Sequence, residues 1–153
     1  DWIKDRALSS WLGDPTLRVL IWSRYTSEIM RITAMLKEHF GDRVVSITGA
    51  TKNVEAIKDS YNSKTPEGIQ IMVCQVAKMA FSHNLAATSE DITFSNTWSF
   101  IEKDQARERG QRPDRVGTLR RFELTYRNSI DEIILRTLDR KENLDDQLSI
   151  ATA

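Results

Sequence analysis

Short apolar runs rich in β-branched residues recur along the chain and alternate with longer stretches of helical periodicity. The clearest run, residues 69–74, follows the turn signal Pro66-Glu67-Gly68 and has the pattern of a strand buried on both faces. Comparable runs lie at residues 18–22, 43–47, 91–94 and 118–124. The last of them is the most polar and is therefore expected at an edge of the sheet.

Apolar residues at helical spacing predict helices between these strands. The helix predicted at residues 26–39 ends at Gly41, and one face of it carries Ile29, Ile32, Leu36 and Phe40. Shorter helices are predicted at residues 5–12 and 53–61. Capping boxes open two more: Ser99 with Glu102 opens residues 99–109, and Ser129 with Glu132 opens a helix whose expected buried side is Ile130, Ile133, Ile134 and Leu138.

This alternation predicts an α/β fold, namely a doubly wound, mostly parallel sheet of about five or six strands with helices on both faces. In such sheets ligands bind beyond the carboxyl ends of the strands. Four polar segments follow predicted strands and would share that edge: Ser23-Arg24, Thr48-Gly49, His83-Asn84 and Ser95 to Trp98.

The bulk composition is that of a soluble globular domain, with 40% hydrophobic and 29% charged residues in 153. We expect one domain at residues 1–144 and a frayed tail at 145–153, which is polar and lacks periodicity. No apolar stretch approaches the roughly 18 residues that span a bilayer, so no membrane association is expected. The single cysteine, Cys74, excludes an internal disulfide framework and suits a reducing compartment.

The charges balance, with 22 basic and 22 acidic residues, which argues against a strongly basic nucleic-acid-binding module. Between residues 107 and 127, however, the sequence contains seven arginines and only three acidic residues. Arginine suits phosphate because its planar fork donates paired, permanently charged hydrogen bonds. The alternative is a solvated charged surface.

Several segments, in order, carry a family resemblance. Motifs IV to VI of superfamily-two helicases resemble three segments of the chain: Val19 to Tyr25, Ile47 to Thr51, and Ile69 to Gln111. The last of these contains the Asn84-Leu85 and Gln105-Ala-x-x-Arg109 elements. Thr118 to Leu138 resembles the strand and Ile-Asp-Glu-x-Ile helix that close the same lobe. The chain thus resembles the second RecA-like lobe of the Snf-type DNA translocases, with phage and bacterial members most similar.

The resemblance implies roles for particular residues. Contacts to a nucleic-acid backbone, which position a strand without reading its sequence, would come from Ser23, Arg24, Thr48, Gly49, Lys52 and Asn84. Trp98 would stack on bases or separate strands, or else anchor the core. Arg109, with Gln105 beside it, would stabilise the charge that develops during ATP hydrolysis. Further residues near the nucleotide would be Asn84, Arg107, Gln111 and Arg112.

None of the six glycines is followed by lysine, so the chain has no Walker A loop. The Asp131-Glu132 pair begins a predicted helix, where acids favour the helix dipole, and is not a Walker B element. The resemblance therefore implies half of a DNA-dependent ATPase. ATP and Mg²⁺ would be held mainly by an amino-terminal lobe of the same polypeptide, and this chain alone would be inactive. No metal ligands are expected here.

The motifs also depart from the family pattern. After Arg109 the chain continues directly with Gly110-Gln111, and about four residues that include a second arginine are absent. Either the lobe lacks that arginine, or residues are missing from the sequence at this point. His83 stands where the family has glycine.

The favoured interpretation is the carboxyl-terminal motor lobe of an ATP-dependent DNA helicase or translocase that acts on DNA of any sequence, in the cytoplasm of a bacterial or phage-infected cell. A catalytically inactive α/β module that binds nucleic acid or protein is the first alternative, which the shortened motif VI favours. An unrelated doubly wound domain that binds a small molecule is the second, because a fold alone does not determine function.

Overall fold

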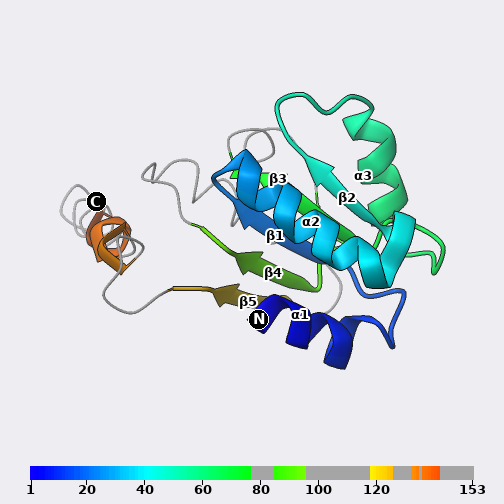
Figure 1. The fold of residues 1–153 in the computed structure, drawn as a ribbon, viewed down its shortest axis with the longest axis horizontal. Coiled ribbons are helices and arrows are strands. Elements are labelled where there is room, and N and C mark those ends of the chain that lie inside the picture. Colours follow the sequence, from blue (N-terminus) through cyan, green and yellow to red (C-terminus); the bar gives the residue numbers. More distant parts are fainter. Residues whose placement is uncertain (77–84, 96–117, 126–131, 135, 142–153) are drawn as a thin grey trace, which may run out of the picture.

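The computed structural model describes residues 1–76, 85–95, 118–125, 132–134 and 136–141. Within them, five parallel strands form one sheet: β1 (Val19–Ser23), β2 (Val44–Ile47), β3 (Ile71–Gln75), β4 (Glu90–Thr93) and β5 (Arg120–Glu123). Their spatial order is β2-β3-β1-β4-β5, so the chain reverses its direction of growth across the sheet (Figure 1). The predicted doubly wound parallel sheet is confirmed, and β5 lies at the edge as expected.

Helices cover both faces of this sheet. One face packs against α1 (Trp2–Arg6), the π-helical turn η1 (Ala7–Trp11) that continues it, and α2 (Thr26–Phe40). A short 3-10 turn, η2 (Gly41–Arg43), leads from α2 into β2. The opposite face packs against α3 (Val54–Asn62) and against Leu85 and Ala87 (Figure 1). Two apolar clusters therefore sandwich the sheet.

The central strands are buried because both faces are covered. All five residues of β1 are buried, and its register pairs Leu20 with Met72 of β3 on one side and with Asp91 of β4 on the other. Cys74 is fully buried in β3, and this burial raises the pKa of its thiol. It is a core residue, which fits its place in a run of apolar side chains.

Several element boundaries and one expected burial differ from the predictions. The first helix begins at Trp2, because the Asp1 carboxylate accepts a hydrogen bond from the Ile3 N–H at 3.0 Å and caps it. Strand β3 begins at Ile71 rather than at residue 69. In the helical residues near the carboxyl terminus, Ile133 is 58% exposed, so its expected burial is wrong, whereas Ile134 and Leu138 are buried.

Residues 134 and 138 are one helical turn apart and share a face, whereas position 133 is rotated by about 100° from that face. Ile130, the capped helix expected at residues 99–109 and the tail at 145–153 lie outside the described residues. Among the helices that the structure describes, none is both long and apolar enough to cross a lipid bilayer.

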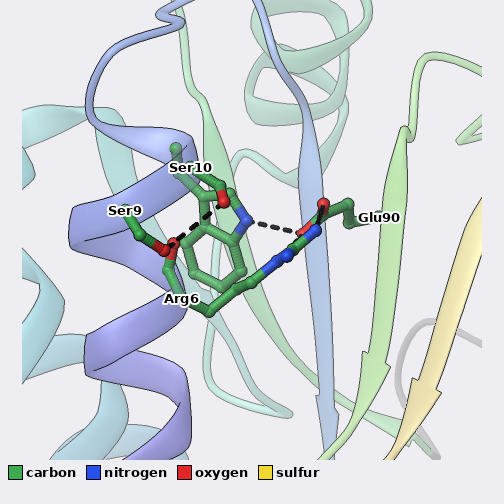
Figure 2. Close-up of polar contacts among 5 residues, drawn as sticks. Arg6, Ser9, Ser10 and Glu90 are labelled. Carbon is green, nitrogen blue, oxygen red and sulfur yellow. Dashed lines mark hydrogen bonds and ion pairs between the residues drawn. The ribbon is translucent and has the colours of Figure 1, made fainter.

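The amino ends of the strands carry buried polar side chains that serve the fold. Arg18, fully buried before β1, donates hydrogen bonds to the carbonyl oxygens of Tyr61, Pro15 and Thr65 at 2.7, 2.9 and 2.7 Å. Glu90, the first residue of β4, pairs with Arg6 and accepts a hydrogen bond from Trp11 Nε1 at 2.6 Å. Figure 2 shows Arg6 of the first helix reaching over one face of the sheet to Glu90.

Gly68 lies in the turn that Arg18 anchors, and we expect Gly68→Ala to destabilise the domain by about 1–3 kcal/mol, as overpacking does. A Cβ there would lie 2.9 Å from the Ser60 carbonyl oxygen, a backbone atom that cannot rotate away. Urea unfolding measures the change. Gly13→Ala is the matched control, because a Cβ at that position meets nothing within 4 Å. Equal stabilities of the two variants would contradict the close contact at Gly68.

Candidate nucleic-acid interface

The carboxyl ends of the parallel strands meet at one edge of the sheet, which we call the rim. Ser23 and Gln75 are the last residues of β1 and β3, Thr48 directly follows β2, and Ser95 lies two residues beyond β4. In the register of the sheet Ser23 pairs with Gln75. The polar positions predicted for this edge are thus brought together by the topology, as far as the structure describes them.

A buried cluster of hydroxyls occupies the centre of the rim. Ser23 and Ser95 are 0% and 5% exposed, and both donate hydrogen bonds to Glu28 Oε2 in the first turn of α2, at 2.5 and 2.7 Å. Ser95 Oγ in turn accepts the Arg24 N–H at 2.8 Å. The cluster therefore joins β1, the segment after β4 and the start of α2.

The half-buried Arg24 and the exposed Tyr25 follow Ser23 along the chain. The Arg24 guanidinium lies over the Tyr25 ring, 5.3 Å from its centroid, a cation–π arrangement. Tyr25 is 51% exposed, and its extended backbone begins α2 without a side-chain cap. The rim thus presents a permanent cation and an aromatic ring beside each other.

The second loop of the rim is a turn closed by threonine hydroxyls. Thr51 Oγ1 accepts the Thr48 N–H at 2.8 Å, and Thr48 Oγ1 accepts the Ala50 N–H at 3.3 Å. The exposed Gly49 donates its N–H to Gln75 Oε1 at 3.2 Å, which links this turn to the end of β3. Lys52 follows and is exposed.

The structure thus brings five of the predicted nucleic-acid contacts to one edge: Ser23, Arg24, Thr48, Gly49 and Lys52. The Ser23 hydroxyl is buried and donates to Glu28, so the groups open to solvent are the exposed Lys52 and Gly49 and the half-buried Arg24. The remaining predicted site residues lie outside the described residues: Asn84, Trp98, Gln105, Arg107, Arg109, Gln111 and Arg112. Their roles stay predictions.

Two residues of the rim were missed by sequence reasoning, Glu28 and Gln75. Glu28 occupies the third position of α2, a place where acids commonly favour the helix dipole, so its pattern signals only a helix start. Gln75 is a polar residue that ends an apolar run, which gives it no distinctive signal. In the part of the chain that the structure describes, no three His, Cys, Asp or Glu side chains gather closely enough to hold a metal ion.

No protein-family model matches the chain, and neither does any curated protein sequence. Among solved structures, the crystal structure of the C-terminal part of the Fun30 ATPase domain is similar, with a TM-score of 0.68 and 23% sequence identity. The similarity covers 88% of this chain but only 44% of that one, so this chain spans less than half of its length. The two share a RecA-like α/β fold, and at this identity the similarity shows the fold alone.

Proposed function

We propose that this chain is the carboxyl-terminal motor lobe of an ATP-dependent DNA helicase or translocase. The observation that carries the proposal is the fold: a five-stranded parallel sheet of order β2-β3-β1-β4-β5, similar over 88% of the chain to the C-terminal part of an ATPase domain. A lobe of this kind implies an amino-terminal partner lobe. The comparison gives no support to the narrower phage or bacterial type or to a bacterial cytoplasm, and both stay predictions.

The rim supplies chemistry suited to a nucleic-acid backbone. Arg24 and Lys52 contribute two positive charges on the loops after β1 and β2, which flank β3 in the sheet, and Gly49 has no side chain that would keep a backbone away. Such groups bind phosphates through charge and release counterions, without reading base edges. Arg24 and Lys52 are therefore proposed to hold DNA irrespective of its sequence.

The catalytic part of the proposal rests on the sequence resemblance. ATP and Mg²⁺ would be bound mainly by the partner lobe, because this chain has no Walker A loop. Arg109, with Gln105, would then approach the γ-phosphate from this lobe, and an arginine so supplied accelerates phosphoryl transfer by roughly 10³- to 10⁵-fold. This chain's share of the reaction is charge stabilisation, and the partner's share is nucleotide binding.

The DNA-binding surface is tested by changing Arg24 and Lys52 together to alanine. We expect the affinity of the chain for a duplex of mixed sequence to fall roughly tenfold or more at 0.1 M salt, and the slope of log affinity against log salt to shrink by about 1.8, for two lost phosphate contacts. Fluorescence anisotropy across a salt series measures both quantities, and the loss should be equal for unrelated DNA sequences.

The matched control removes two exposed lysines far from the rim, Lys4 in α1 and Lys37 in the last turn of α2. It changes the net charge by the same amount, so it separates a local contact from a general charge effect. An unchanged salt slope in the Arg24 and Lys52 variant, or an equal loss in the control, would remove the rim from the DNA path.

A further inference from the structure

We infer that Glu28 is a positioning residue: its carboxylate holds the backbone of Arg24 in the geometry in which the rim contacts a phosphate backbone. The inference rests on the proposed function, because it concerns the same rim. It assigns Glu28 no contact with DNA. Its action passes through Ser95, whose hydroxyl lies between the carboxylate and the Arg24 N–H.

The direction of these hydrogen bonds follows from counting protons. A hydroxyl has one proton to donate and lone pairs to accept with, whereas an ionised carboxylate only accepts. Ser23 and Ser95 both give their protons to Glu28 Oε2, so the 3.2 Å contact between the two hydroxyls carries no proton of its own. Ser95 Oγ then has a lone pair for the Arg24 N–H, which donates to it at 2.8 Å.

The result is a hydrogen-bond relay in which each group donates to the next: the Arg24 N–H donates to the Ser95 hydroxyl, and the Ser95 hydroxyl donates to the Glu28 carboxylate. Hydrogen bonds in such a chain strengthen one another, and those that end on a charged acceptor are shorter and stronger than neutral ones. Removing the carboxylate frees the proton of Ser95 to rotate toward other acceptors. The relay would then no longer fix Arg24 relative to the segment after β4.

The position of the Arg24 backbone matters because the residue is the first one beyond β1, where the chain turns into α2. No side chain caps the start of that helix, since Tyr25 is its N-cap and makes no capping hydrogen bond. Among the described residues, the hydrogen bonds that join this corner to the segment around β4 include those of the Glu28 cluster and the bond from the Phe94 N–H to the Trp22 carbonyl, 2.8 Å long.

The sign of the charge also favours a positioning role over a direct one. A carboxylate near a phosphate path repels the phosphates, so a direct effect of Glu28 on DNA would weaken binding, and its removal would strengthen binding. Positioning predicts the opposite sign. The two roles are therefore distinguished by the direction in which affinity changes when Glu28 is replaced.

The experiment is a double-mutant cycle on the full chain, with a fluorescently labelled 20-base-pair duplex as the probe. Glu28→Ala is expected to weaken binding by roughly five- to tenfold at 0.1 M salt, about the loss expected for Arg24→Ala, because each removes one phosphate contact. The double variant should bind no more weakly than Arg24→Ala alone, since the two residues act through one contact. Glu28→Gln keeps an oxygen that accepts from both serines and should retain the affinity within about twofold.

Ser95→Ala provides a second variant that breaks the relay without touching the carboxylate, and the same loss and the same coupling to Arg24 are expected. Glu55→Ala is the matched control: it removes an exposed acid from the first turn of α3 and changes the net charge equally. It should cause no loss of affinity, whereas an equal loss would show that Glu28 acts only as an acid at a helix start.

The outcomes separate this inference from the proposed function. If Arg24→Ala weakens binding while Glu28→Ala and Ser95→Ala do not, or if their losses add to that of Arg24→Ala, positioning by Glu28 is overturned and the DNA surface stands. If Glu28→Ala tightens binding, the carboxylate acts by repulsion. If Arg24→Ala itself leaves both affinity and salt slope unchanged, the proposed DNA surface fails, and the inference fails with it.

Discussion

Replacing Arg109 by alanine, in a protein that joins this chain to its amino-terminal lobe, is expected to lower DNA-stimulated ATP hydrolysis by about 10³-fold or more. The reason is that an arginine supplied across the lobes acts on charge that develops in the transition state. In the proposed motor, ground-state binding of ATP would belong to the other lobe, so nucleotide affinity should be nearly unchanged. A purely structural arginine would instead lower stability before it lowered turnover.

The measurement is turnover at saturating ATP and DNA, beside the nucleotide affinity and the melting temperature of the same variant. Arg31→Ala, which removes an exposed arginine of α2, serves as the control and should keep its activity. Turnover within about threefold of the parent protein would show that the family role does not transfer to Arg109. The second arginine of the family motif, absent between Arg109 and Gly110, would then be the better candidate.

Glu90→Ala is expected to destabilise the domain by about 3 kcal/mol, the lower end of the range for breaking a buried ion pair by removing one partner. Glu90 is 3% exposed, and its carboxylate accepts from Trp11 Nε1 and pairs with Arg6 (Figure 2). The substitution leaves the fully buried indole N–H without an acceptor. Arg6 is 25% exposed on its side chain and recovers part of its hydration, which keeps the loss at the lower end.

Urea unfolding of this chain measures the change in free energy. Glu90→Gln should lie between the parent and the alanine variant, because its amide oxygen can still accept from the indole N–H. Glu67→Ala, at an exposed position in a turn, is the control and should change stability by less than about 0.5 kcal/mol. A loss for Glu90→Ala as small as that of the control would mean that the first helix is not anchored through Glu90.

The sheet could be predicted from the sequence because burial on both faces leaves an unbroken apolar signal, as in β1 and β3. The polar network at the amino ends of the strands gives no such signal. The sequence pattern predicts Gln70 as part of a strand. Its side chain, however, donates to the carbonyl oxygens of Trp11 and Asp14, 59 and 56 residues away. Glu90 likewise depends on partners 84 and 79 residues away. Periodicity describes neighbours within a few positions and cannot reveal such pairings.

In the candidate site, too, some residues could be predicted from local sequence and others could not. Arg24, Gly49 and Lys52 could be located from their place after predicted strands and from the family resemblance. The role of Glu28 could not be predicted, because it depends on a hydrogen bond with Ser95, which lies 67 residues away in the sequence. The resemblance also assigned Ser23 to the phosphate surface, whereas its hydroxyl donates to Glu28 inside the rim. Which hydroxyls are free to meet a ligand depends on tertiary packing.

The central claim, that this chain is half of a DNA-dependent motor, is tested most directly by steady-state ATP hydrolysis with and without DNA. The chain alone should show no turnover above background, and the chain joined to an amino-terminal RecA-like lobe with Walker A and B elements should hydrolyse ATP at a rate that DNA increases. Turnover by the chain alone at roughly 1 s⁻¹ or more, or a joined protein whose hydrolysis does not respond to DNA, would contradict it.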